Sequence, residues 1–406
     1  SVGIRRVTAL RKITESGAVH DKREIDAVLE VLNETTLDLG PRVAEFERRG
    51  AELLAKQHGV FVNSGSSALR LAVDLLGCEP GDEVITPALT FSTDVAPLVH
   101  SGIVPAFVDV EPDTLQIDVS KIEEMIGPRT KGMLIPNLVG NIPDWDAIKT
   151  ISEQHDLPVI EDSCDVLDSW LRGSRTGERV PITVTSFARS HAMTCAGMGG
   201  MIAVDDDDWY DRALVRRRWG RRSESFLYGT RKDDPNRFDT LADGTPYDFI
   251  FVFDDAGYNF EPSEIMAAYG LVQMDKLADF NARRRHNFDQ LDAMFADHED
   301  LVIRPRATEG AETIWMRYPF LLRDGIDRTL VQEFLAERNV ATRMVWTGNI
   351  LRQPGFADMS HRQPADGLPG TDLVMDRALT LPIHHGLTSD DLGYMVECLN
   401  ELFRTL

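Results

Sequence analysis

The chain has 406 residues, 43% of them hydrophobic, so it can bury a large core, and its length predicts about two to three domains. Its formal net charge of -23 argues against nucleic acid or an anionic membrane surface as a main partner. No apolar run approaches the roughly 18 to 20 residues that span a bilayer, the N-terminus lacks a signal-peptide core, and the four cysteines have no paired spacing. We therefore expect a cytoplasmic protein with reduced thiols and no membrane partner.

The first 75 residues predict two helices and then a strand, a turn and a third helix. Residues 21–33 have helical periodicity, and a second helix follows the break at Gly40-Pro41. The apolar face of the first helix consists of Ile25, Val28, Leu29 and Leu32. An apolar strand from Gly59 turns through Ser64-Gly65-Ser66-Ser67 into an apolar helix. Such a turn offers free N–H groups and the positive end of the helix dipole to a phosphate, but it can equally be an ordinary N-cap.

The stretch from residue 83 to residue 161 alternates between β-rich runs and helical segments. Strands are expected at residues 83–86, 105–110, 132–136 and 158–161, with helices beginning at Ser92, Ser120 and Trp145. This alternation predicts an α/β fold with a mostly parallel sheet covered by helices on both faces. In such sheets ligands bind at the carboxyl ends of the strands.

An acidic cluster follows the last of these strands. It reads Glu161-Asp162-Ser163-Cys164-Asp165. A carboxylate at this place could be a metal ligand, a helix cap or a partner for a cationic ring nitrogen. Because no His or Cys pair has the spacing of zinc ligands, we expect no metal site.

A single imidazole stands in the next loop. Residues 184–188 and 199–204 are β-rich, and the loop between them carries His191, five residues after Ser186. A lone histidine in a loop is more often a bystander than a catalyst. Only its context can give it a role.

The second half of the chain predicts a smaller α/β unit. A basic helix over residues 209–222 is read mainly as a solvated face, residues 231–248 as a long loop, and the region up to about residue 295 as a long helix. Strands near residues 301–304 and 317–321 and helices over 329–338 and 390–403 follow. We expect a large domain with N-terminal helices at residues 1–285 and a small domain at 286–406.

Several motifs together resemble one known family. They are Asn63-Ser-Gly-Ser-Ser-Ala-Leu, Gly81-Asp-Glu-Val-Ile-Thr-Pro, Ile160-Glu-Asp, Ser186-Phe and Gly257-Tyr-Asn. In order and spacing they resemble the DegT/DnrJ/StrS sugar aminotransferases, which are fold-type I, aspartate aminotransferase-like pyridoxal phosphate enzymes. That family carries S-F-x-x-x-K, whose Lys bonds covalently to the cofactor. Here His191 stands at the Lys position.

A His in place of that Lys marks a subset of the family, the nucleotide-sugar 3-dehydratases. The stretch Ala341-Thr-Arg-Met-Val-Trp-Thr-Gly-Asn-Ile-Leu-Arg-Gln-Pro resembles the closing motif of this subset. One branch of the subset holds a [2Fe–2S] cluster on four cysteines, and the other, the GDP-4-keto-6-deoxymannose type of the colitose pathway, uses glutamate and has no cluster. Ser223 and Ser225 stand where the cluster branch has C-x-C, so the resemblance favours the branch without an iron–sulfur cluster.

The resemblance also implies roles for single residues. His191 would be the catalytic base, Phe91 would stack on the cofactor ring, and Asp162 would pair with the ring nitrogen. The resemblance places the other cofactor contacts at Gly65, Ser66, Asp165, Ser186 and Asn259, the last reaching across from a second subunit. Substrate contacts are expected at Arg352, Trp219 and Arg221. Two departures from the family are Ala196-Gly197-Met198-Gly199-Gly200 in place of G-E-G-G, and His191-Ala192 in place of a His-His pair.

The implied activity is that of a carbon–oxygen lyase in deoxysugar biosynthesis. The enzyme would use pyridoxal or pyridoxamine phosphate to remove the 3-hydroxyl of a nucleotide-linked 4-keto-6-deoxyhexose, with glutamate as amino donor and a homodimer as the active form. His191 suits a base because an unperturbed imidazole has a pKa of about 6.5. Two alternatives stay open: a sugar aminotransferase whose Lys was replaced, and a cofactor-binding protein without catalysis. The nucleotide and the sugar epimer also stay open.

Overall fold

A computed structural model describes residues 11–231 and 237–406, and its centre is a seven-stranded sheet. The strands lie in the order β1 (His58–Val62), β9 (Gly200–Val204), β8 (Ile182–Ser186), β5 (Val159–Asp162), β4 (Thr130–Pro136), β2 (Glu83–Pro87) and β3 (Val104–Val108). The five strands from β8 to β3 run parallel to their neighbours in that order, whereas β9 is antiparallel to both β1 and β8. The predicted mostly parallel sheet is confirmed.

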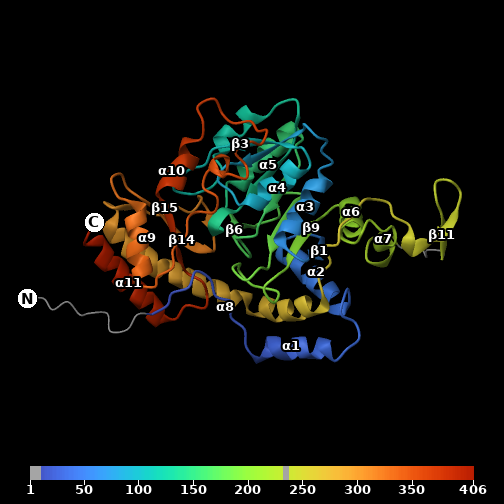
Figure 1. Cartoon of the computed structure of the whole chain (residues 1–406), viewed down its shortest axis with the longest axis horizontal. Coiled ribbons are helices and arrows are strands. Elements are labelled where there is room, and N and C mark those ends of the chain that lie inside the picture. Colours follow the sequence, from blue (N-terminus) through green and yellow to red (C-terminus); the bar gives the residue numbers. More distant parts are fainter. Residues whose placement is uncertain (1–10, 232–236) are drawn as a thin grey trace, which may run out of the picture.

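Helices cover both faces of this sheet (Figure 1). Because side chains alternate along a strand, Val84 and Ile160 pack on one face and Ile85 and Val159 on the other. The first face is covered by α3 (Gly65–Leu75) and α6 (Asp207–Arg217). The second is covered by α5 (Trp145–His155), α2 (Pro41–Leu53) and the first half of α8 (Glu264–Phe295).

The strand register brings the loops that follow β4, β5 and β8 to one edge of the sheet. Pro136 of β4 lies beside Asp162 of β5, and Asp162 lies beside Val184 of β8. Ser186, at the end of β8, therefore emerges at the same carboxyl edge as Asp162. The loop with His191 starts directly after it.

The C-terminal part forms a separate, smaller sheet. Strands β12 (Val302–Ile303), β14 (Arg317–Leu322) and β15 (Ala378–Pro382) are antiparallel. Their core contains the end of α8, and the helices around it are α9 (Arg328–Glu337), α10 (Pro369–Arg377) and α11 (Ser389–Phe403). The predicted domain boundary at residues 285/286 falls inside α8, which contributes to both cores, so the two-domain division stays a prediction.

Two peripheral segments stand out in Figure 1, where α1 (Lys22–Leu32) lies along α8 and a hairpin extends away from the body. The hairpin consists of β10 (Phe238–Thr240) and β11 (Pro246–Asp248) and follows α7 (Ser223–Leu227). The remaining elements are α4 (Ser92–His100) and the small strands β6 (Trp170–Leu171), β7 (Ser174–Arg175) and β13 (Ala311–Glu312). No helix among the described residues is long and apolar enough to cross a membrane.

Three sequence predictions of local structure need correction. The helix expected from Ser120 is two 3-10 turns, since the segment before Gly127-Pro128 is too short to offset the cost of starting an α-helix. The basic helix ends at Arg217 because Trp219 and Gly220 adopt left-handed backbone angles, with φ of 59° and 82°. The expected loop over residues 231–248 contains the hairpin, and its residues 232–236 lie outside the described part.

Candidate active site

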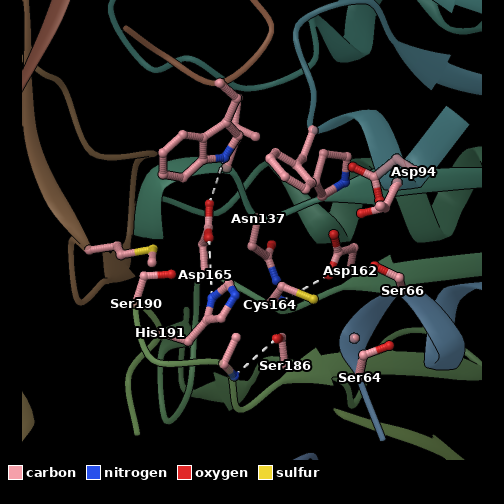
Figure 2. Close-up of a pocket in the computed structure, with 18 of the residues that line it drawn as sticks. Ser64, Ser66, Asp94, Asn137, Asp162, Cys164, Asp165, Ser186, Ser190 and His191 are labelled. Atoms are coloured by element: carbon pink, nitrogen blue, oxygen red, sulfur yellow. Dashed lines mark hydrogen bonds and ion pairs between the residues drawn. The ribbon is translucent and has the colours of Figure 1, made fainter. Parts of the chain in front are cut away.

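A cavity of about 320 Å³ opens at the carboxyl edge of the sheet. It brings together seven residues that the sequence singles out, namely Gly65, Ser66, Phe91, Asp162, Asp165, Ser186 and His191. Figure 2 shows Ser64, Ser66 and Ser186 on one side of it and His191 with Asp165 on the other. The residues come from four different segments of the chain, so only the fold unites them.

One end of the cavity suits a phosphate. The Ser64 hydroxyl caps α3 by accepting a hydrogen bond from the N–H of Ser67 at 3.1 Å, and the other first-turn N–H groups have no partner within the helix. A Cβ on Gly65 would lie 2.7 Å from the Cβ of Ser186, so only glycine lets the helix start approach the end of β8 this closely. The helix dipole and the Ser186 hydroxyl then act on the same small volume.

Two buried carboxyl groups line the middle of the cavity. Asp162 is 6% exposed and accepts a hydrogen bond from the N–H of Cys164 at 2.8 Å, and Asp94 is fully buried. Burial, helped by the nearby Asp162, raises the pKa of Asp94 well above its ordinary range, and burial also raises the pKa of Asp162. Because two carboxylates cannot cheaply share one dry site, the stronger upward shift favours a proton on Asp94 and leaves the negative charge to Asp162.

Phe91 forms part of the mouth of the cavity. It precedes the first residue of α4, and 51% of it is exposed. Phe91 is therefore not a residue of the hydrophobic core. A flat ring entering the cavity can meet an aromatic face there without displacing any packed side chain.

His191 and Asp165 form the far wall. The Nδ1 of His191 lies 3.8 Å from an Oδ of Asp165, too far for a hydrogen bond. Burial lowers the pKa of His191 to about 4 and raises that of Asp165 to about 7. The imidazole is therefore neutral at neutral pH, and its contact with Asp165 is not an ion pair. The buried Arg284 of α8 holds this loop by donating to the carbonyls of His191 and Ala192.

Four residues expected at the site lie elsewhere in this chain. Asn259 is exposed, and its backbone forms a β-bridge with Arg218. The neighbouring Trp219 donates its backbone N–H to the carbonyl of Tyr258 at 2.6 Å. Arg221 stacks on Trp219, with its guanidinium carbon 4.4 Å from a ring centroid. Arg352 is exposed and already pairs with Asp372 and Asp376 at 3.2 and 3.0 Å. None of the four lines the cavity.

The basic helix is neutralised within the fold. Its ion pairs are Arg216 with Asp74, Arg217 with Glu47, Arg218 with Glu261 and Arg222 with Asp254. Acidic partners of this kind leave these guanidinium groups little free charge for a substrate phosphate. Across residues 11–231 and 237–406, no cluster of three or more His, Cys, Asp or Glu could hold a metal ion.

Sequence reasoning missed four residues of the cavity wall, Asp94, Asn137, Arg317 and Trp346. Trp346 belongs to a motif that resembles the dehydratases, and Asn137 follows a predicted strand. Both could therefore have been recognised from the sequence as candidate site residues. No sequence motif points to Asp94 or Arg317. They come from α4 and from the start of β14, and only the tertiary structure brings them to the cavity.

These features fit pyridoxal phosphate. The helix start and Ser186 match its phosphate, Asp162 matches its protonated ring nitrogen, and Phe91 matches its ring face. The fold and the cavity define a pyridoxal phosphate-dependent enzyme with the aspartate aminotransferase-like fold.

Comparison with known proteins identifies the family. Residues 19–400 match the DegT/DnrJ/EryC1/StrS aminotransferase family, and the chain belongs to it. It is 33% identical to the dTDP-4-dehydro-2,6-dideoxy-D-glucose 3-dehydratase of Saccharopolyspora spinosa, over 96% of this chain and 86% of that protein. It is 31% identical to the GDP-4-keto-6-deoxy-D-mannose 3-dehydratase of Yersinia pseudotuberculosis, over 82% and 84%.

A solved structure extends the likeness to three dimensions. It is a GDP-4-keto-6-deoxymannose-3-dehydratase with a trapped PLP–glutamate geminal diamine, and it superposes with a TM-score of 0.86 at 26% identity. The superposition covers 96% of this chain and all of the other. The expected fold class and family are thereby confirmed.

Proposed function

We propose that this protein is a pyridoxal phosphate-dependent 3-dehydratase that removes the 3-hydroxyl of a nucleotide-linked 4-keto-6-deoxyhexose. The observation that carries the proposal is His191, which stands where the aminotransferases of the family have Lys and lines the cavity with Asp162, Ser186 and Phe91. Two relatives that are 33% and 31% identical to this chain are named as 3-dehydratases of nucleotide-linked 4-keto sugars, which supports the proposal.

The chemistry divides between cofactor and protein. When bound in its pyridoxamine form, the cofactor supplies the amine that condenses with the sugar ketone and a ring that accepts electrons. His191 cannot bond covalently to the cofactor as Lys does, so it stays free to take the proton from the cofactor's C4′. Its lowered pKa keeps the imidazole unprotonated at neutral pH, as a base must be.

The other residues bind and orient. Asp162 keeps a negative charge opposite the ring nitrogen, which favours the electron-accepting form of the ring. The protonated Asp94 supports that charge without adding a second one. The first turn of α3 and Ser186 hold the phosphate end, so that C4′ can lie near His191.

The amino donor and the cluster-free mechanism belong to the same proposal. Glutamate is the donor favoured by the trapped adduct in the solved relative. Cys164 lines the cavity without another cysteine beside it, and Ser223 and Ser225 are buried serines, so we propose turnover without an iron–sulfur cluster. An assay of several nucleotide-linked 4-keto-6-deoxyhexoses would identify the nucleotide and the sugar epimer.

We also propose a homodimer with composite sites. The exposed positions of Asn259 and Trp219, and the half-buried position of Arg221, lie outside the chain's own cavity. They support a dimer because these residues can then complete the partner's cavity. A cytoplasmic location is part of the proposal, since all four cysteines are free, as a reducing compartment keeps them.

The decisive experiment replaces His191. His191→Asn should still bind pyridoxamine phosphate, because the phosphate and ring contacts come from other residues, while release of the 3-deoxy sugar and ammonia should fall by roughly 10²-fold or more. His191→Lys should gain a borohydride-reducible bond to the cofactor and lose dehydration. His286→Asn, an exposed histidine on α8, serves as the matched control.

Each alternative has its own outcome. Dehydration at the parental rate in His191→Asn would show that the imidazole is a bystander and refute the mechanism. An amino sugar formed by His191→Lys, with no dehydration by the parent, would identify an aminotransferase whose Lys was lost. Cofactor binding without turnover of any 4-keto sugar by any variant would identify a non-catalytic protein.

A further inference from the structure

One buried face of α8 is polar where the helix passes two loops of the cavity wall. Asn281, Arg284 and Asn287 lie three residues apart on this face, and each is only 3% exposed. The side-chain amide of Asn281 donates to the carbonyl of Leu167 at 3.2 Å, and that of Asn287 donates to two carbonyls just after β15, at 3.2 and 3.1 Å. The face therefore ties the loop that carries Asp165 and the end of the small sheet to one rigid element.

Arg284 is the charged member of this face, and it contacts the loop of His191. Its Nη2 donates to the carbonyl of His191 at 3.0 Å, and its Nη1 donates to the carbonyl of Ala192 at 2.9 Å. Both bonds go to the backbone, so they fix the loop and leave the imidazole uncovered. Arg284 does not line the cavity, and the small void that it shares with Asp165 has no room for a water molecule. Its route to the reaction therefore runs through His191.

No carboxylate balances the charge of Arg284 within residues 11–231 and 237–406. Its Nε is buried without an acceptor, and no Asp or Glu raises its pKa. Burial lowers that pKa to about 10, so the guanidinium is still charged at neutral pH. After burial itself, the positive charges of Arg284 and Arg317 lower the pKa of His191. A protonated imidazole would therefore face an unbalanced cation.

We propose that Arg284 is a positioning residue for dehydration, which holds the loop of His191 with two Nη groups while its unbalanced charge disfavours a proton on the imidazole before the reaction begins. The inference rests on the proposed function, in which His191 takes a proton from the cofactor. A structural anchor would need only neutral donors, such as the amide that Asn281 supplies one turn earlier. Burying a cation without a counter-ion costs free energy, so anchoring alone does not favour an arginine here.

Other titratable and charged groups face His191 or Arg284 from the neighbouring elements. They are Cys164 and Asp165 after β5, Arg317 on β14, Arg283 on α8, and His384 and His385 after β15. Burial keeps the thiol and both histidines neutral, since it raises the pKa of the thiol and lowers the pKa of each imidazole. Burial raises the pKa of Asp165 to about 7, so this carboxylate loses its charge as pH falls. Arg284 keeps its charge throughout.

Two substitutions separate the anchor from the charge. Arg284→Lys keeps the cation but loses the two-pronged contact, and Arg284→Met removes the cation as well. Dehydration by pyridoxamine-loaded enzyme should fall roughly 10- to 100-fold in both variants, because a displaced base slows proton transfer. The KM for the nucleotide sugar should not change, because Arg284 lies outside the cavity. Arg285→Met, on the exposed side of α8, should match the parent in both quantities.

The charge can be tested without turnover, by histidine NMR on cofactor-free protein labelled with ¹³C at Cε1. The His191 signal is identified by its absence from His191→Asn. From about pH 8 to about pH 5.5 it should stay that of a neutral ring in the parent and in Arg284→Lys, because the pKa of His191 is lowered to about 4. In Arg284→Met the midpoint should rise by about one to two pH units, so protonation should begin within that range.

Three results would overturn the inference. One is a His191 that titrates near its ordinary value of 6.5 in the parent, a measurement that needs no folded variant. The others are equal titration of His191 in the parent and in Arg284→Met, and turnover at the parental rate by Arg284→Lys. If instead the titrations differ as expected but loaded parent dehydrates no nucleotide sugar, the proposed function is refuted and the effect of Arg284 on His191 stands.

Discussion

His191 and Asp165 face each other across 3.8 Å with pKa values shifted in opposite directions. Burial is the main cause of both shifts, because it disfavours the charged form of each group. The nearby Arg284 and Arg317 lower the pKa of the imidazole further. At the scale of one residue, the proposed base His191 is kept neutral by its surroundings. An ionised Asp165 would stabilise any proton that His191 takes during catalysis.

This arrangement predicts the pH dependence of dehydration. The single-turnover rate constant of pyridoxamine-loaded enzyme should fall with decreasing pH through about 7, as Asp165 gains a proton, and again through about 4, as His191 does. Asp165→Asn should abolish the step near pH 7 and keep the step near pH 4. At pH 8 its rate constant should be roughly tenfold lower than that of the parent, which corresponds to one pKa unit of base strength. Rapid pH jumps from a neutral stock avoid acid unfolding. A single step near 6.5 that survives Asp165→Asn would show that the imidazole is solvated and not buried.

At the scale of an element, α1 is oriented against its own hydrophobic pattern. The buried Glu24 of α1 pairs with Lys276 of α8 at 2.5 Å, while the apolar face points to solvent. Ile25, Leu29 and Leu32 are 51%, 51% and 54% exposed. A helix that buries its carboxylate and exposes its leucines has a surface suited to a second copy of the chain.

We expect Leu29→Glu to weaken the proposed dimer. If the sites are composite as proposed, activity should fall in proportion to the monomer formed. Sedimentation velocity and activity, measured over the same range of concentrations, check both effects. Leu330→Glu, which changes an equally exposed leucine on α9, should leave both unchanged. A parent chain that sediments as a fully active monomer would exclude the homodimer.

At the scale of the whole molecule, His385 lies at the junction between α8 and the end of the small sheet. Its ring stacks on Phe280 at 3.9 Å and is 2% exposed, with neither ring nitrogen hydrogen-bonded. Arg283 donates to its carbonyl. Burial, with Arg284 as the next cause, lowers the pKa of His385 far below its ordinary value of 6.5.

The shift links the stability of the fold to pH. The unfolded chain takes up a proton at His385 as pH falls below 6.5 and the folded chain does not, so the stabilisation is present above that pH and lost below it. Between pH 7 and pH 5 the parent should lose about 1–2 kcal/mol more unfolding free energy than His385→Leu. Urea unfolding at both pH values measures the difference, with the exposed His286→Leu as control. Equal losses in parent and variant would mean that His385 is protonated in the folded state.

Motifs that are contiguous in the chain were readable before the fold was known. Gly65 and Ser66 at a helix start, Asp162 at a strand end and His191 five residues after Ser186 are defined by local spacing, which regular strands and helices preserve. The alternation of strands and helices predicted the parallel sheet for the same reason. The prediction of an α-helix from Ser120 was wrong because the segment has too few residues to stabilise one, and two 3-10 turns form instead.

Only the tertiary structure decided which distant side chains share the cavity and how they ionise. Asp94 reaches Asp162 from α4, and Arg317 and Trp346 reach His191 and Asp165 from the C-terminal part, across sequence separations that no local pattern measures. The outward face of α1 was set in the same way, by a long-range pair between Glu24 and Lys276. Burial and the resulting pKa shifts are sums over everything packed around a group, so they exist only once the chain has folded.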